Sequence, residues 1–125
     1  SYYTAFQSEA NAVKDDLLAF LLEQKRLGKT VAGYGAAAKG NTLLNYAGVK
    51  PDLLLCVYDA AQAKQHKFMP GSHIPILPSG EIASALPDFV LILPWNIAKE
   101  IRLQNARLEK KGARFFTAVP RLQIF

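Results

Sequence analysis

Short apolar runs alternate with helical segments along this chain, and this alternation restricts its possible folds more than any other feature. Strands separated by helices predict a parallel sheet with right-handed crossovers. We therefore expect an α/β fold, a Rossmann-like three-layer domain with a mainly parallel sheet of about five strands. The first and fourth strands should be neighbours, and Pro75 and Pro78 should confine the third to an edge. The runs are "KTVAGYG" (29–35), "DLLLCVYD" (52–59), "HIPIL" (73–77), "DFVLIL" (88–93) and "ARFFTAV" (113–119).

Helices are expected between these runs. The leading segment, residues 1–28, has apolar residues at three- and four-residue steps and predicts a helix over about 5–27, stopped by Gly28. The other three predicted helices are "GNTLLNYAG", capped by Asn41 or Thr42 and closed by Gly48; "PSGEIASAL", capped by Ser79; and "WNIAKEIRLQNARLEKKG", stopped by Gly112.

The length of 125 residues fits one domain, so we interpret 1–125 as a single unit. Because it starts at Ser1 without methionine, we interpret the chain as an excised part of a larger protein. Its apolar runs are far shorter than the roughly 20 residues of a membrane span, and no signal peptide opens it. The expected location is therefore cytoplasmic, with no membrane partner.

The net charge of +5 does not predict a nucleic-acid partner. Residues 1–93 hold eight Lys/Arg and eight Asp/Glu, so the excess lies entirely in 94–125. Most of those cations fall within 99–114, where no aromatic residues alternate with them, and a solvated helix face explains them. The single cysteine, Cys56, lies in an apolar run and reads as a core residue. Because the chain has only two histidines, His66 and His73, in addition to this cysteine, it has too few soft ligands and the sequence predicts no metal site.

A glycine pattern follows the first predicted strand. Gly33, Gly35 and Ala38 have the spacing G-x-G-x-x-A, and Asp59 stands 24 residues after Gly35, near the position of a ribose-binding acid. Such glycines let the backbone approach a diphosphate at a helix N-terminus. The alternative is that the small residues only permit close packing of strand and helix. Lys39 precedes Gly40 rather than following it, so the stretch is not a P-loop.

The ends of the first and fourth strands should flank one crevice. Gly35, Ala36 and Ala37 follow the first strand, and Pro94-Trp95-Asn96 follows the fourth. Trp95 offers a flat apolar wall and Asn96 a polar amide, although a sole tryptophan can also serve the core. His73, after a Pro-Gly turn, is a candidate site residue or an ordinary turn residue.

Three stretches in this order, "GYGAAAKGNTLLNY", "KFMPGSHIPI" and "LILPWN", resemble the C-terminal domain of S-adenosylmethionine-dependent C-methyltransferases. The resemblance is strongest to enzymes that methylate C-3 of nucleotide-linked 4-keto-deoxysugars, and it covers nearly the whole chain. It implies a parent enzyme with an N-terminal zinc module, a middle domain that holds S-adenosylmethionine and the catalytic residues, and this substrate-side domain. It therefore implies a sugar nucleotide and the other methyltransferase domains as partners, with no cofactor and no catalytic residue on this chain.

The resemblance also implies which residues contact the substrate. They belong to the glycine-rich loop (34–41), the acidic loop that begins at Asp59 (59–67), the Pro-Gly-x-His turn (70–73) and the Pro-Trp-Asn corner (94–96). The residues are Tyr34, Gly35, Ala36, Ala37, Lys39, Gly40, Asn41, Asp59, Lys67, Gly71, His73, Pro94, Trp95 and Asn96. The acidic loop departs from the family pattern, which puts its ligand contacts in question: Asp59, Lys64, Gln65 and Lys67 match, whereas Ala60, Ala61, Gln62 and His66 do not.

Two other functions stay open from the residues alone. A nicotinamide-binding Rossmann module would use the glycine loop and Asp59 for NAD(P), and a structural or interaction domain would bind no nucleotide at all.

Overall fold

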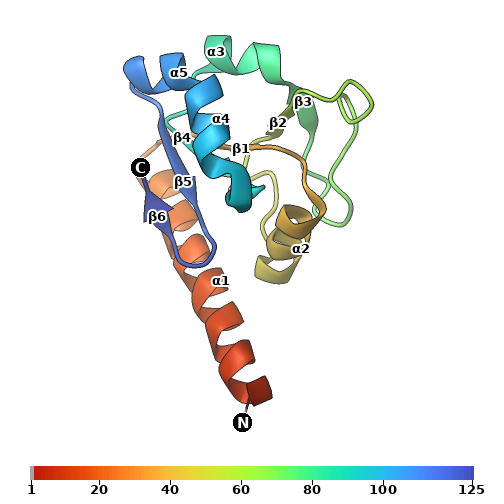
Figure 1. The fold of residues 1–125 in the computed structure, drawn as a ribbon, viewed down its shortest axis with the longest axis vertical. Helices are drawn as coiled ribbons and strands as arrows, with labels where there is room; N and C mark the ends of the chain where they lie inside the picture. The colour runs from red at the N-terminus through yellow and green to blue at the C-terminus, as the bar shows by residue number, and fades with distance from the viewer. Residues whose placement is uncertain (1) are drawn as a thin grey trace.

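The structure is a computed structural model that describes residues 2–125, with side chains described from Phe6 onward. Six strands and five α-helices follow one another along the chain, joined in two places by 3-10 turns at Ser79–Glu81 and Trp95–Ile97 (Figure 1). In chain order the elements are α1 Tyr2–Arg26, β1 Val31–Tyr34, α2 Ala38–Ala47, β2 Val57–Asp59, β3 Ile76–Pro78, α3 Ile82–Ala85, β4 Phe89–Ile92, α4 Ala98–Gln104, α5 Ala106–Lys110, β5 Arg114–Thr117 and β6 Gln123–Ile124.

The strands form one sheet in the order β3-β2-β1-β4-β5-β6. Every neighbouring pair is parallel except β5 and β6. The register of β1 on β4 runs from Val31 opposite Phe89 to Tyr34 opposite Ile92. The predicted Rossmann-like fold is thereby confirmed, as are the pairing of the first and fourth strands and the edge position of the third. β6 is a sixth strand that the sequence pattern did not predict.

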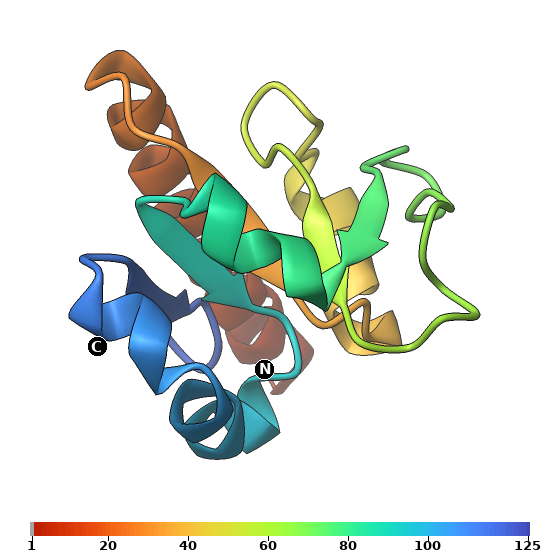
Figure 2. The same cartoon turned by 90° about the horizontal axis from the view of Figure 1, so that it is seen from above.

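Helices cover both faces of this sheet (Figure 2). Alternate residues of β4 divide between two cores because successive side chains of a strand point to opposite faces. Leu91 and Leu93 pack with α1 and α2 on one face, and Val90 and Ile92 with α3, α4 and α5 on the other. The result is the expected three-layer architecture.

The leading helix is longer than the face that it covers. In Figure 1 the first turns of α1 extend beyond the ends of the strands. Leu17 is the first described side chain of α1 that is buried, and it packs in the core with Leu21 and Phe20. The prediction of a leading helix is confirmed, with its start at Tyr2 rather than residue 5.

The predicted cap of the second helix is wrong. α2 begins at Ala38 after Ala37, with no side-chain cap, so Asn41 and Thr42 lie inside the helix. The Thr42 hydroxyl instead donates to the Ala38 carbonyl at 3.1 Å. The tight turn after β1, in which the Ala37 amide donates to the Gly35 carbonyl, starts the helix early. Gly48 ends it as predicted, at a φ of 71°.

Three further elements differ from the predictions. The amides of Leu53 and Leu54 bond back to the Lys50 carbonyl in a turn, so only 57–59 of "DLLLCVYD" is strand. Ser79 lies within a 3-10 turn rather than capping a helix. The segment 95–112 breaks between α4 and α5 at Asn105, where φ is −120° and the side-chain amide donates to the Ile101 carbonyl.

Gly40 sets how closely α2 lies on the sheet. A Cβ at Gly40 would stand 2.5 Å from the Leu93 Cβ, at a point where neither backbone can move freely. Gly40 is therefore required for close packing, buried in the interface between helix and sheet. Since α2 carries the amides that follow the glycine-rich turn, this contact also positions the site described below.

Gly40→Ala should lower the free energy of unfolding by about 1–3 kcal/mol, because the added methyl overpacks the contact with Leu93 despite the higher helix propensity of alanine. Urea unfolding followed by circular dichroism measures the change. Gly80→Ala is the matched control: a Cβ at Gly80 meets open space, so stability should stay within about 0.5 kcal/mol. Equal stability of both variants would contradict close packing at Gly40.

Candidate functional site

The turn after β1 stands against the corner after β4. Gly35 has a φ of 86°, and a Cβ there would lie 2.6 Å from Pro94 Cδ, so both its backbone conformation and its space require glycine. The Leu93 amide donates to the Tyr34 carbonyl at 3.0 Å, which extends the pairing of the two strands to this point. The glycine-rich turn and the Pro-Trp-Asn corner are therefore neighbours as predicted, but no single hollow is lined by both: Trp95 lines one hollow and Ala36 and Ala37 line another.

Asp59, at the end of β2, holds this turn from the other side. Its Oδ2 accepts the Ala36 amide at 2.7 Å and its Oδ1 accepts the Ala61 amide at 2.7 Å. Lys64 Nζ donates to the Ala36 carbonyl at 3.1 Å, and the Gly35 amide donates to the Tyr58 carbonyl. Both oxygens of the buried Asp59 carboxylate are therefore engaged by the backbone. Its role is to shape the glycine-rich turn.

The larger of two hollows beside α2 is an open groove of about 670 Å³. One wall is the stripe Phe6, Ala10 and Val13 of α1, which recurs at helical spacing. Glu9 of α1 also lines the groove. The rest comes from α2, the corner after β4 and the segment after β5, with Lys39, Thr42, Leu43, Tyr46, Trp95, Val119 and Pro120. Trp95 is thus a site-facing residue, as the sequence suggested, and Lys39 brings a cation to a mainly apolar groove.

The smaller hollow, of about 350 Å³, lies at the start of α2 and is bounded by the acidic loop and the Pro-Gly turn. Ala36, Ala37, Ala38, Asn41, Lys64, Met69, Pro70 and Ile76 line it. Asn41 Oδ1 is buried and, within the part of the chain that the structure describes, accepts no hydrogen bond. A buried acceptor without a donor is costly, so a ligand that donates to it would gain binding energy.

The Pro-Gly-x-His turn docks on α2 by its backbone. Asn45 Nδ2 donates to the Pro70 carbonyl at 2.9 Å, and a Cβ at Gly71 would stand 2.5 Å from Asn45 Oδ1. The exposed His73 ring stacks on Phe68, with centroids 4.0 Å apart and planes 4° apart. Gly71 is therefore needed for docking, and His73 lines neither hollow.

The remaining predicted residues lie outside the two hollows. Tyr34 packs with the core on the face covered by α3 to α5, and Gly40 is buried under α2. Asn96 and Lys67 are exposed and line neither hollow. The sequence therefore grouped residues that the structure distributes over three places: the larger groove, the smaller hollow and the scaffold beneath them.

The sequence of this chain matches a known protein family. The sequence model of a family described as the C-methyltransferase C-terminal domain matches residues 1–120. The chain belongs to this family. The resemblance found in the sequence is thereby confirmed at the level of the family, and the chain is a C-methyltransferase C-terminal domain.

One curated protein and one solved structure are similar to this domain. C-methyltransferase NovU of Streptomyces niveus is 41% identical over 93 residues, which make up 74% of this chain and 22% of NovU. The chain thus spans about a fifth of the length of that relative. The crystal structure of UDP-D-quinovosamine 4-dehydrogenase from Vibrio fischeri matches with a TM-score of 0.55 at 21% identity, over 74% of this chain and 79% of that one. This second likeness concerns the fold alone.

Reactive groups are sparse in the described part of the domain. Burial raises the pKa of the Cys56 thiol, which favours its protonated, unreactive form and fits a core role. Among residues 2–125, no group of three or more His, Cys, Asp or Glu side chains could hold a metal ion. None of the helices over the same residues combines the length and the apolar character needed to cross a membrane.

Sequence reasoning missed the wall that α1 contributes to the larger groove. The apolar residues of this segment were used only to predict a helix, yet Phe6 is 61% exposed and lines the groove together with Val13. The sequence did carry a signal for this wall. The apolar residues at helical spacing begin at Phe6, many residues before the part of the helix that a short sheet can cover. Lys64 was noted as matching the family pattern but not as a ligand-side residue, and the structure places it on the smaller hollow.

Asp59→Ala should lower the free energy of unfolding of the C-methyltransferase domain by about 2 kcal/mol, because it leaves the amides of Ala36 and Ala61 without their charged acceptor. Chemical denaturation measures the loss. Asp52→Ala removes an exposed carboxylate 3.5 Å from Lys25 and should cost no more than about 0.5 kcal/mol. Similar losses in the two variants would argue against a special role for Asp59.

Proposed function

We propose that this domain is the substrate-side part of an S-adenosylmethionine-dependent C-methyltransferase that acts on a nucleotide-linked keto-sugar, and that it has no activity alone. The observation that carries the proposal is that α2 borders two hollows of different character, each of which includes residues from the first turn of the helix. One is apolar, with an aromatic wall and a lysine; the other is smaller and is lined by Asn41, whose buried Oδ1 accepts no hydrogen bond from the described residues. A sugar nucleotide has a matching division into a flat base, a diphosphate and a polar sugar.

The diphosphate is assigned to the start of α2. The first amides of a helix, here Ala38 to Gly40, have no partner inside it and carry the positive end of the helix dipole. Ala37 at the N-cap provides no side-chain cap, so within the described residues these amides are available to an anion. Lys39 on the larger groove and Lys64 on the smaller hollow add positive charge on either side.

The two ends of the ligand are assigned by chemistry. The base goes to the larger groove, where the Trp95 ring supplies an apolar surface for stacking. The sugar goes to the smaller hollow, where a hydroxyl can donate to Asn41 Oδ1. This assignment keeps Lys39, Asn41, Trp95, Ala36 and Ala37 as ligand contacts and makes Gly35, Gly40, Asp59 and Gly71 the residues that shape the site.

A nicotinamide cofactor fits these residues less well. Dinucleotide binding needs a free acid at the end of the second strand for the ribose hydroxyls. Asp59 stands at that place, but both of its oxygens already accept backbone amides. The same objection applies to the ribose of S-adenosylmethionine. We therefore assign the methyl donor, together with the zinc module, to the remainder of the parent enzyme, which the longer NovU chain leaves room for.

The catalytic step also needs groups that the two hollows do not supply. Methylation of carbon requires a base for the proton beside the keto group and a donor held in line with the resulting enolate. Glu9 is the one carboxylate that lines either hollow in residues 2–125, and no histidine lines them. In the parent enzyme the base and the donor would therefore approach this site from another domain.

Thymidine diphosphate and uridine diphosphate, titrated separately, should quench the fluorescence of Trp95, the single tryptophan of the chain. Lys39→Ala should weaken binding of the better ligand about five- to tenfold through loss of a charge-assisted contact. Lys110→Ala, on α5 at the opposite face of the sheet, should leave the affinity unchanged. Quenching by NAD at a lower concentration than by either diphosphate would favour a nicotinamide-binding module. No response to any of the three compounds would favour a domain that binds no nucleotide.

The chain alone should form no methylated product when it is mixed with S-adenosylmethionine and a 4-keto-deoxysugar nucleotide, because base and donor site lie outside it. Mass spectrometry of the sugar nucleotide is the measurement. Turnover above the rate without protein would overturn the assignment of the catalytic groups to another domain.

A further inference from the structure

The first turns of α1 form a groove wall that the core holds only at Val13, which is partly buried against it. From Phe6 to Asp16 no described side chain of α1 is buried, whereas Leu17, Phe20 and Leu21 are. A helical segment held only by its own hydrogen bonds is marginally stable in water. Besides the core contact of Val13 and the ion pair of Asp16 with Arg121, the position of this wall over the larger groove therefore depends on contacts that its side chains make with α2.

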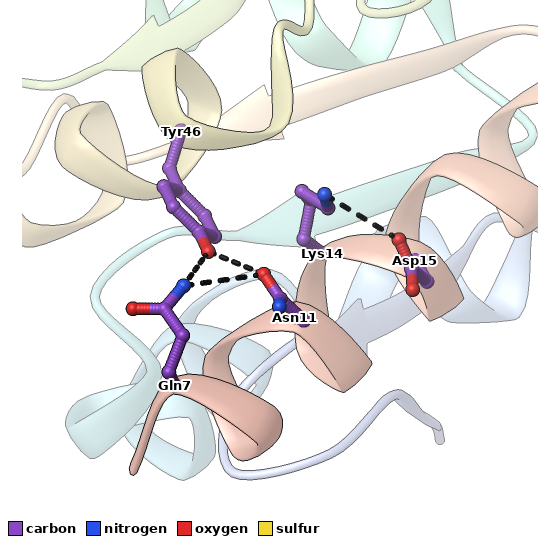
Figure 3. Close-up of polar contacts among 5 residues, drawn as sticks. All are labelled: Gln7, Asn11, Lys14, Asp15 and Tyr46. Atoms are coloured by element: carbon purple, nitrogen blue, oxygen red, sulfur yellow. Dashed lines mark hydrogen bonds and ion pairs between the residues drawn. The ribbon is translucent and has the colours of Figure 1, made fainter. Parts of the chain in front are cut away.

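Those contacts converge on one phenol, Tyr46 near the end of α2 (Figure 3). Gln7 Nε2 donates to the Tyr46 hydroxyl at 2.6 Å, and the hydroxyl in turn donates to Asn11 Oδ1. Gln7 Nε2 also lies 3.3 Å from Asn11 Oδ1, which closes a triangle of hydrogen bonds. Lys14 Nζ stands over the Tyr46 ring, 5.7 Å from its centroid. Gln7, Asn11 and Lys14 occupy one stripe of α1, so three successive turns hold the same ring.

We infer that Tyr46 is a latch that fixes the first turns of α1 against α2 and thereby sets the width of the larger groove. The polar stripe of α1 that grips Tyr46 lies beside the apolar stripe of Phe6, Ala10 and Val13 that lines the groove, and Tyr46 itself lines it. Releasing the phenol therefore frees the wall without removing any residue from the groove. Tyr46 is a positioning residue: it acts on the groove through the helix it holds.

The Tyr46 ring both lines the groove and holds the α1 wall, so the state of the groove and the state of the latch are coupled. Tyr46 is 45% exposed, so its bonds can exchange with water far more readily than core contacts can. A ligand that fills the groove would hold both walls and favour the latched arrangement, whereas an empty groove leaves the wall dependent on the latch alone. This last step rests on the proposed function; the latch itself does not.

Tyr46→Phe tests the latch, because it deletes the hydroxyl and keeps the ring over the groove. Amide hydrogen exchange at residues 7–14 should become about fivefold faster or more, the effect of losing one net hydrogen bond. Exchange at residues 17–26 of the same helix should stay unchanged and serves as the internal control. Unchanged exchange at 7–14 would overturn the latch, and so would equal acceleration along all of α1, which would mean general destabilisation.

Trp95 gives a second readout without any ligand. Opening of the wall should increase the quenching of Trp95 fluorescence by acrylamide in Tyr46→Phe. The double change Gln7→Ala with Asn11→Ala should have the same effect, and adding Tyr46→Phe to it should change nothing further, because all three side chains act as one unit. Additive effects would contradict a shared latch. Weaker binding of thymidine or uridine diphosphate by Tyr46→Phe is expected only if the proposed function holds, whereas exchange and quenching test the latch by itself.

Discussion

The close approach of α2 to the sheet is the constraint on which the rest of this domain depends. Gly35 lets the chain turn against Pro94, and Gly40 lets the helix lie on Leu93 with no side chain between them. These two contacts fix where α2 begins and how it points. The uncapped amides, Lys39, Asn41 and Tyr46 are all carried on that one helix. The geometry of both hollows is therefore set by two positions that line neither of them.

The fold could be predicted from the sequence because its signals are local and repeated. Apolar runs at β4 and β5 and the helical periodicity before Gly28 each specify their own element, and alternation specifies the sheet. Boundaries failed where tertiary contacts decide them. Leu53 to Leu55 have the composition of a strand, yet a turn at Lys50 removes them from the sheet. β6 was missed because two exposed residues pairing with β5 carry no periodicity.

The candidate site was predicted in part, and the errors have a common cause. Motifs group residues by chain position, whereas a site groups them by the direction of their side chains. Tyr34 and Gly35 are neighbours in the chain, but the tyrosine points to the core opposite the groove. Asp59 was predicted as a ligand contact, and a chain pattern cannot show that each of its oxygens also accepts a backbone amide. His73 follows the motif and stacks on Phe68 instead.

The two edge strands of the sheet, β3 and β6, affect whether sheets of neighbouring domains can pair edge to edge. An exposed edge strand offers free backbone groups on which another sheet can grow, and this is a common route to aggregation. Here β3 ends in Pro78, which has no amide hydrogen to donate, and β6 contributes only Gln123 and Ile124 at the other side. Neither border offers a long template for a foreign strand. A module with such short borders can be attached to other domains at high local concentration with little risk of sheet-to-sheet polymerisation.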